Sequence, residues 1–179
     1  MIYLNIFHTE SIAFSNTGLT GPIPTTLTNL QSLEVFKVEN CNLFGDGYMS
    51  LYDIPTLKVL GVAGNKFLTG TLDGIGKLAK LEELYLGNTK MGGPLPEELG
   101  QLSNLWIITS PETAFTGAIP ASWGNLKSLK ELDFSQNQLT GALATELGQL
   151  TKLETVNLYE NGEYSLSVCV SIISLSKRN

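Results

Sequence analysis

The most regular feature of this chain is the recurrence of apolar residues at a spacing of 24 positions. A first column consists of Ile12, Phe36, Leu60, Leu84, Ile108, Leu132 and Val156. A second column, two residues later, consists of Phe14, Val38, Val62, Leu86, Ser110, Phe134 and Leu158. Alternation with a period of two predicts a short strand with both of these side chains pointing inward. A repeat of this length indicates a solenoid, in which stacked units bury a shared core.

A polar column follows each predicted strand. It consists of Thr17, Cys41, Asn65, Thr89, Thr113, Asn137 and Asn161. An inward asparagine can hydrogen-bond the backbone groups that become free where the chain turns off the strand. We therefore expect this column to be structural, with looser turns where a hydroxyl or a thiol replaces the amide.

A Thr-Gly-x-Ile-Pro type segment comes next, as in residues 19–24 and 115–120. Its glycine permits backbone angles closed to other residues, and its second proline suits an extended edge and cannot continue a helix. The later spacing of Leu99, Leu102 and Leu105 predicts a short helical or 3-10 segment. Strand, turn, second extended piece and short helix together complete one coil.

The resulting pattern, LxxLxLxxNxLTGxIPxxLgxL, resembles the leucine-rich repeat of the plant-type class over about residues 3–162. The resemblance implies an α/β solenoid: a right-handed superhelix with a parallel concave β-sheet, second short strands after it, and short helical or 3-10 convex segments. We expect one domain over residues 1–179, with a partial first repeat (1–10), regular repeats (11–162) and an atypical C-terminal segment (163–179). Related proteins include ectodomains of receptor-like kinases and receptor-like proteins, and polygalacturonase inhibitors. Their repeats bind peptides, proteins or glycans and are not catalytic.

Several segments depart from this pattern. The second repeat has residues 44–49 (FGDGYM) where the Thr-Gly segment is expected, and the third repeat gains Leu68. Beyond Gly162 the repeat is lost, and apolar residues alternate with serines and Cys169. This alternation predicts a half-buried strand that covers the last turn. The alternative is an accidental translated extension that does not act as a cap.

Composition narrows the range of partners. The formal net charge is −6, and Arg178 is the only arginine, so binding to nucleic acid or to anionic membrane surfaces is disfavoured on electrostatic grounds. Cys41 and Cys169 are separated by about five turns, or roughly 24 Å, too far for a disulfide, and are interpreted as free thiols. The family resemblance suggests an extracellular or cell-surface location. The sequence itself shows no signal peptide, cysteine-paired cap, glycosylation site or transmembrane segment, so the compartment stays open.

Catalytic chemistry has little support. His8 is the single histidine and precedes the regular repeats, and Cys41 has no histidine to activate it. The carboxylate pairs Glu82-Glu83 and Glu97-Glu98 are expected to be ordinary surface charge. Residues 74–77 (GIGK) match a phosphate-binding loop poorly. We expect no enzyme activity, no metal and no cofactor.

Binding along the concave sheet is the leading hypothesis, because solenoids present an extended concave surface. The outward strand positions carry tyrosines interleaved with carboxylates. An exposed tyrosine is a typical interface anchor, and the carboxylates supply orientation and selection against anions. The candidate binding residues are Lys37, Glu39, Glu83, Tyr85, Glu112, Glu131, Asp133, Tyr159 and Glu160. The hypothesis is a receptor-like module for a protein or peptide. Its alternative is an inhibitor of a secreted cell-wall-degrading enzyme, and an ice-binding protein is a weaker alternative.

Overall fold

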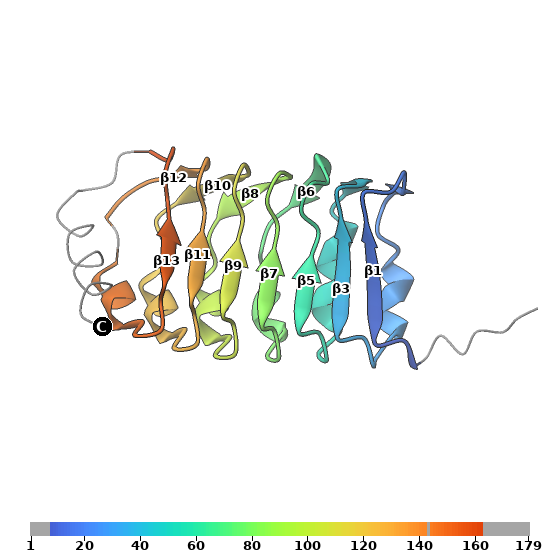
Figure 1. Cartoon of the computed structure of the whole chain (residues 1–179), viewed down its shortest axis with the longest axis horizontal. Helices are drawn as coiled ribbons and strands as arrows, with labels where there is room; N and C mark the ends of the chain where they lie inside the picture. Colours follow the sequence, from blue (N-terminus) through green and yellow to red (C-terminus); the bar gives the residue numbers. More distant parts are fainter. Residues whose placement is uncertain (1–7, 143, 163–179) are drawn as a thin grey trace, which may run out of the picture.

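The computed structural model describes residues 8–142 and 144–162, which form a right-handed solenoid with two parallel sheets (Figure 1). The larger sheet has seven strands, and they follow one another along the solenoid in chain order. These strands are β1 (Ser11–Ser15), β3 (Val35–Glu39), β5 (Val59–Gly61), β7 (Glu83–Tyr85), β9 (Ile107–Thr109), β11 (Glu131–Asp133) and β13 (Thr155–Asn157). This sheet is the concave face predicted from the repeat.

The register of the concave sheet follows the sequence repeat. Ser11 pairs with Val35, and Glu83 pairs with Ile107, each a shift of 24 residues along the chain. The same shift relates Asp133 to Asn157 in the last pair of strands. Residues of one sequence column therefore lie side by side across the sheet, and a ligand on this face would contact successive repeats.

A second sheet of six strands lies along one edge of the coil. Its strands are β2 (Thr20–Gly21), β4 (Asn42–Gly45), β6 (Phe67–Gly70), β8 (Lys90–Pro94), β10 (Ala114–Gly117) and β12 (Gln138–Leu139). The convex side is formed by η2 (Thr25–Asn29), η3 (Gly47–Asp53), η4 (Ile75–Lys77), η5 (Glu97–Gln101), η6 (Ala121–Asn125) and η7 (Thr145–Gln149). All of these convex helices are of the 3-10 type, since the tight spacing of turns leaves little room for a wider helix.

The core lies between the sheets and the convex helices. Leucines that recur every 24 residues, such as Leu57, Leu81 and Leu105, are fully buried. Trp123 is also fully buried, and its indole N–H donates to the carbonyl of Pro96 at 3.1 Å in the preceding turn. The shared core explains why no single repeat is a stable unit, because each coil covers the apolar face of its neighbour.

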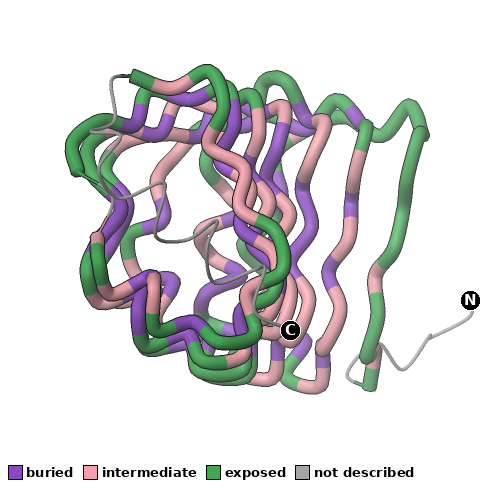
Figure 2. Tube along the Cα trace, turned by 60° about the vertical axis from the view of Figure 1, so that its left-hand side comes forward, coloured by how far each residue is buried: buried purple, intermediate pink, exposed green. Residues whose placement is uncertain are grey.

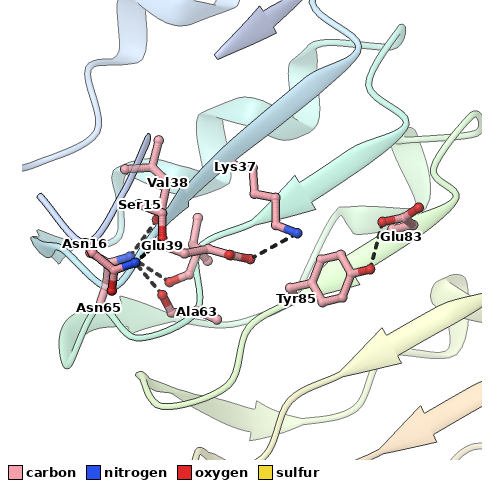
Figure 3. Close-up of polar contacts among 10 residues, drawn as sticks. Ser15, Asn16, Lys37, Val38, Glu39, Ala63, Asn65, Glu83 and Tyr85 are labelled. Carbon is pink, nitrogen blue, oxygen red and sulfur yellow. Dashed lines mark hydrogen bonds and ion pairs between the residues drawn. The ribbon is translucent and has the colours of Figure 1, made fainter. Parts of the chain in front are cut away.

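The asparagines of the polar column join neighbouring turns. Asn65 is fully buried, and its amide nitrogen donates to the carbonyls of Val38 and Val62, both at 2.8 Å (Figure 3). Its Oδ1 accepts the backbone N–H of Leu43 at 3.1 Å. Asn137 bonds Phe115 N–H and the Ser110 carbonyl in the same way. One side chain thus satisfies backbone groups of two turns.

Thr89, a hydroxyl member of the same column, bonds only within its own turn. Its Oγ1 donates to the Leu86 carbonyl at 2.9 Å and accepts the N–H of Met91 at 3.3 Å. Thr113 donates to the Asn137 Oδ1 at 2.6 Å, and its hydroxyl lies 3.2 Å from that of the buried Ser110. The polar Ser110 in an apolar column is therefore accommodated by a local hydrogen-bond group.

The second and third repeats, whose sequences depart from the pattern, still form regular turns of the solenoid. In the second, Tyr48 is fully buried within η3 and its hydroxyl donates to the carbonyl of Thr71. In the third, the extra Leu68 is fully buried and turns its neighbour Phe67 outward. Both sequence breaks thus change which side chain fills the core, while β4 and β6 still pair in parallel.

The first turn corrects one expectation. Phe14 was predicted to point inward and be covered, but 53% of its surface is exposed. β1 is the end strand of the described sheet, so no preceding described turn packs on it (Figure 2).

The strand predicted within residues 163–179 and Cys169 lie outside the described residues. No helix within 8–142 or 144–162 has the length and apolar character needed to cross a membrane.

Candidate functional site

The concave sheet presents three outward columns that follow the strand alternation. Most of their members are half-buried, as expected for the open face of a sheet. Four of them correct the prediction that these columns are simply outward: Gly61 and Gly87 are buried, Ile107 is only 8% exposed and Ser135 only 4% exposed. Ser135 folds onto its own strand, since both its N–H and its hydroxyl donate to Asp133.

A cluster on β3, β5 and β7 brings residues of successive repeats together. The ammonium of Lys37 lies 4.4 Å from the centroid of the Tyr85 ring, two strands away (Figure 3). The same ammonium lies 3.7 Å from the carboxylate of Glu39. The strand between them carries Gly61, where a Cβ would lie only 2.8 Å from Lys37 Cγ. The absence of a side chain at Gly61 therefore lets Lys37 reach Tyr85.

The hydroxyl of Tyr85 is held in place as well. It donates to Glu83 Oε2 at 2.7 Å on the same strand. Burial raises the pKa of Tyr85 above its ordinary value, and the hydrogen bond to Glu83 raises this pKa further. The charges of Glu131 and Glu39 act on this pKa in the same direction. The ring therefore stays neutral at physiological pH and lies between one ammonium and several carboxylates.

Asp133 is already engaged within the protein. Its Oδ1 accepts the N–H of Ser135 at 2.8 Å and the Ser135 hydroxyl at 2.7 Å. Its Oδ2 accepts from the amide of Asn157 at 3.2 Å on the next strand. A carboxylate with these partners organises the turn and the strand pair, and it has less capacity left for a ligand than sequence reasoning assumed.

Glu131 lies on β11 itself, and the remaining candidates Glu112, Tyr159 and Glu160 lie at the turn after a strand. Glu112 and Glu160 adopt positive φ, as does Gln136 between them in the column. Asn88 donates to Glu112 at 3.1 Å, and Gln136 donates to Glu160 at 2.7 Å. A hydrogen bond from the exposed Tyr159 lowers the pKa of Glu160 and raises that of Tyr159. These carboxylates thus form a second group, along one edge of the concave face.

The other sequence features have structural roles or no partners for chemistry. In the GIGK segment, the N–H of Gly74 donates to the carboxylate of Glu98 at 3.0 Å. The carboxylate of Glu98 therefore occupies the donor that a bound phosphate would need. His8 is exposed, and Cys41 is buried. No three His, Cys, Asp or Glu side chains of the described ranges gather as a metal site.

Sequence reasoning missed Gly61 as part of this site. The printed sequence does contain a signal, because Gly61 interrupts an outward column between Lys37 and Tyr85. When only one strand separates a lysine from an aromatic residue, the long lysine side chain can reach the ring across that strand.

A family model described as "Leucine-rich repeat region" matches residues 10–177. Receptor-like protein 6 of Arabidopsis thaliana is 26% identical over 105 residues, covering 59% of this chain and 11% of that protein. Receptor-like protein 36 of the same plant is 30% identical over 106 residues, covering 58% of this chain and 15% of that protein. The chain therefore spans only a small part of these relatives.

Several solved structures are similar to this chain in fold. The plant peptide hormone receptor RGFR1, in complex with RGF2, has a TM-score of 0.82 and 30% identity, covering 90% of this chain and 26% of that one. The Arabidopsis receptor kinase HAESA, in complex with the peptide hormone IDA and the co-receptor SERK1, has a TM-score of 0.81 and 31% identity, covering 85% and 26%. Together with the match over residues 10–177, the repeat and the two parallel sheets show that this chain belongs to the leucine-rich repeat family, with the plant-type repeat.

Proposed function

We propose that this chain is a non-enzymatic recognition module of receptor-like type that binds a peptide or a protein segment on its concave sheet. The observation that supports the proposal most strongly is the cluster of Lys37, Tyr85 and Glu83 across the gap at Gly61. Tyrosine is enriched at protein interfaces and among the residues that contribute most to binding, and charged groups beside it supply orientation and specificity. The likeness to ectodomains solved with peptide hormones supports the same class of ligand.

The cluster also suggests how a ligand would be bound. The Lys37 ammonium is shared between the Tyr85 ring and Glu39, so it is oriented before any ligand arrives. Orientation in advance reduces the entropy lost on binding. A peptide in extended form can lie across the strands and contact several repeats, because neighbouring strands of a parallel sheet are only about 4.8 Å apart. Its aliphatic or aromatic side chain would pack on Tyr85, and its basic groups would pair with Glu83 and Glu131.

Display selection tests this proposal. A random linear peptide library is selected against the full chain, and the affinities of recovered peptides are measured by calorimetry. The double substitution Lys37→Ala with Tyr85→Ala removes the cluster and should weaken binding about tenfold or more, as for interface hot spots.

The matched control removes an exposed lysine between η4 and β7 and an exposed polar side chain on η5: Lys80→Ala with Gln101→Ala. Its affinity should equal that of the unmodified chain. The proposal fails if no peptide is enriched over an unrelated protein, or if both double variants lose affinity equally.

The inhibitor alternative differs in the ligand, which would be a folded enzyme with a basic surface. Acidic groups on the later concave strands, such as Glu131, would suit such a surface. Inhibition of a purified fungal pectinase by the full chain distinguishes this alternative from peptide recognition.

Ice binding receives less support from the structure. It needs a flat array of hydroxyls on neighbouring strands, but Thr116 pairs with Pro94 and Gln138, not with another threonine. A plant ice-binding protein shares 20% identity at a TM-score of 0.57, a likeness of fold alone. We expect no thermal hysteresis from this chain.

A further inference from the structure

Two exposed aromatic side chains lie in the middle of the solenoid. The large apolar residues exposed in the described ranges are Phe14, Leu19, Phe44, Phe67 and Tyr159. Phe14, Leu19 and Tyr159 belong to the first and last described turns, which have a described neighbouring turn on one side only. Phe44 and Phe67 belong to interior turns, yet 47% and 57% of their surfaces are exposed. Their exposure is not an end effect.

The two rings come from neighbouring strands of the second sheet. Phe44 on β4 pairs in register with Phe67 on β6, on the edge of the coil and away from the concave sheet (Figure 1). Their neighbours Leu43 and Leu68 point inward and are 4% and 0% exposed. The core on this side is therefore filled without the two phenylalanines, which point outward.

The repeat does not require aromatic residues at this place. Counted at the repeat spacing from Phe44, four other turns carry the small residues Thr20, Gly92, Thr116 and Thr140, and the third turn, shifted by its extra residue, has the inward Leu68 there. A phenylalanine that replaces a small residue on an outward face gains no core packing and leaves apolar surface in water. Exposed apolar patches of this kind mark interaction sites on folded proteins.

One lysine lies beside the Phe67 ring, and a second is the neighbour of Phe67 in sequence. The Lys90 ammonium on β8 lies 5.5 Å from the centroid of the Phe67 ring, and the exposed Lys66 immediately precedes Phe67. Lys37 and Lys58 form ion pairs with carboxylates. Within the part of the chain that the structure describes, Lys66 and Lys90 form none. The patch thus has positive charge on a chain whose formal net charge is −6.

We propose that this aromatic-lysine patch, made of Phe44, Phe67, Lys66 and Lys90, is a second binding surface, for a polypeptide segment that carries an apolar side chain beside one or two carboxylates. The apolar side chain packs against the two rings, and the carboxylates accept from the two ammonium groups. This surface lies on a different sheet from the concave cluster, so both could be occupied in one complex. The proposal does not depend on the concave-face function.

Charge and chemistry favour a polypeptide over an anionic polysaccharide. A polyanion gains affinity from many cations, but this patch offers only two ammonium groups on an acidic protein. Most of the available binding energy comes from covering the two rings, since apolar area and aromatic anchors dominate protein interfaces. An acidic-apolar segment uses both features of the patch.

The test is a selection of peptides that bind the full chain. Peptides that also bind the double variant Phe44→Ser with Phe67→Ser are removed by counter-selection. Peptides retained only by the unmodified chain should contain Asp or Glu beside an apolar residue. Their dissociation constants should rise about tenfold or more on the double serine variant. Lys66→Glu with Lys90→Glu keeps the rings and reverses the charge, and it should weaken the same peptides and reduce their dependence on salt.

Phe14→Ser is the matched control, because it removes a ring of similar exposure at the first turn, and it should leave the affinity unchanged. Circular dichroism confirms that each variant is folded. The proposal is overturned if the recovered peptides are neutral or basic, or if the charge reversal leaves their affinity unchanged. Binding of heparin that the charge reversal abolishes, without any peptide binding, would assign the patch to polyanions. A dimer of the unmodified chain that the serine variant dissociates would assign it to a second copy.

Discussion

Replacing Asn65 by leucine tests the physical basis of the repeat most sharply. The amide of Asn65 bonds groups in two turns: the carbonyl of Val38 and the N–H of Leu43 in one, and the carbonyl of Val62 in the other. Leucine has the same number of side-chain heavy atoms and the same branching, although it is larger, and it bonds none of these groups. At about 1 kcal/mol for each of these buried backbone groups, the free energy of unfolding should fall by about 3 kcal/mol.

The comparison is with Thr89→Val, in the same column of the next turn. Thr89 bonds only the Leu86 carbonyl and, at the longer distance of 3.3 Å, the N–H of Met91. Both partners belong to its own turn, so the local backbone can adjust when the hydroxyl is lost. We expect a loss of about 1 kcal/mol.

Urea denaturation followed by far-ultraviolet circular dichroism measures both variants under one condition. The asparagine variant should show the larger drop in midpoint, with a similar dependence on urea if unfolding stays cooperative. If the two variants differ by less than about 0.5 kcal/mol, within the ordinary scatter of surface substitutions, inter-turn bonding by the amide does not stabilise the solenoid. The same conclusion would follow if Asn65→Leu were as stable as the unmodified chain.

Three further predictions concern the concave cluster and the packing of turns. Gly61→Leu should displace Lys37 from Tyr85, since even a Cβ would lie 2.8 Å from Lys37 Cγ, and should weaken concave-face ligands with little loss of stability. Glu83→Gln should lower the pKa of Tyr85 toward its ordinary value, although burial would still keep it raised. Because the folded state raises this pKa, Tyr85 should stabilise the fold below about pH 10, and this contribution should decline as pH rises further. Gly124→Ala should cost about 2 kcal/mol, because its Cβ would lie 2.7 Å from the Glu146 carbonyl oxygen in the next turn.

Each of these predictions has a direct measurement. Calorimetry with a selected peptide reports on Gly61→Leu, and unchanged affinity would mean that the position of Lys37 is irrelevant. Absorbance of tyrosinate between pH 9 and 13, as a difference from Tyr85→Phe, reports the pKa of Tyr85. A pKa that does not move in Glu83→Gln would rule out the charged carboxylate of Glu83 as a cause. For Gly124→Ala, a lower midpoint of urea denaturation is the expected result. Gly18→Ala is the control and should leave the midpoint unchanged, since nothing lies within 4 Å of a Cβ at that position.

The coil, the two sheets and the inward columns could be predicted from the sequence because one physical rule determines them. Each turn must bury an apolar face against the next, and the chain repeats the residues that do so. Leu60, Leu84 and Leu132 are fully buried as that rule requires. The rule also explains its failure at Phe14, since burial depends on a neighbouring turn and the first described turn lacks one on its outer side.

The surface could be predicted only in part, because it depends on side-chain reach between repeats. The outward column places Lys37 and Tyr85 two strands apart, but only the coordinates show that the ammonium crosses Gly61 to the ring. Asp133 is outward as expected, yet Ser135 and Asn157 already occupy its oxygens.

The insertion of Leu68 illustrates a different difficulty. A one-residue change in register decides which of two adjacent apolar residues is buried, and sequence columns alone do not show which one. The structure buries Leu68 and leaves Phe67 exposed. The exposed ring could therefore not be identified as a surface feature before the fold was known.

Hydrogen–deuterium exchange of the full chain, with and without a saturating selected peptide, tests recognition by the concave face most directly. Slower exchange should be confined to β3, β5, β7 and β9 and to the turns that follow them. The Lys37→Ala with Tyr85→Ala variant should lose this protection at the same peptide concentration. Protection confined to the convex helices η3 to η6, or retained in full by that variant, would contradict the account.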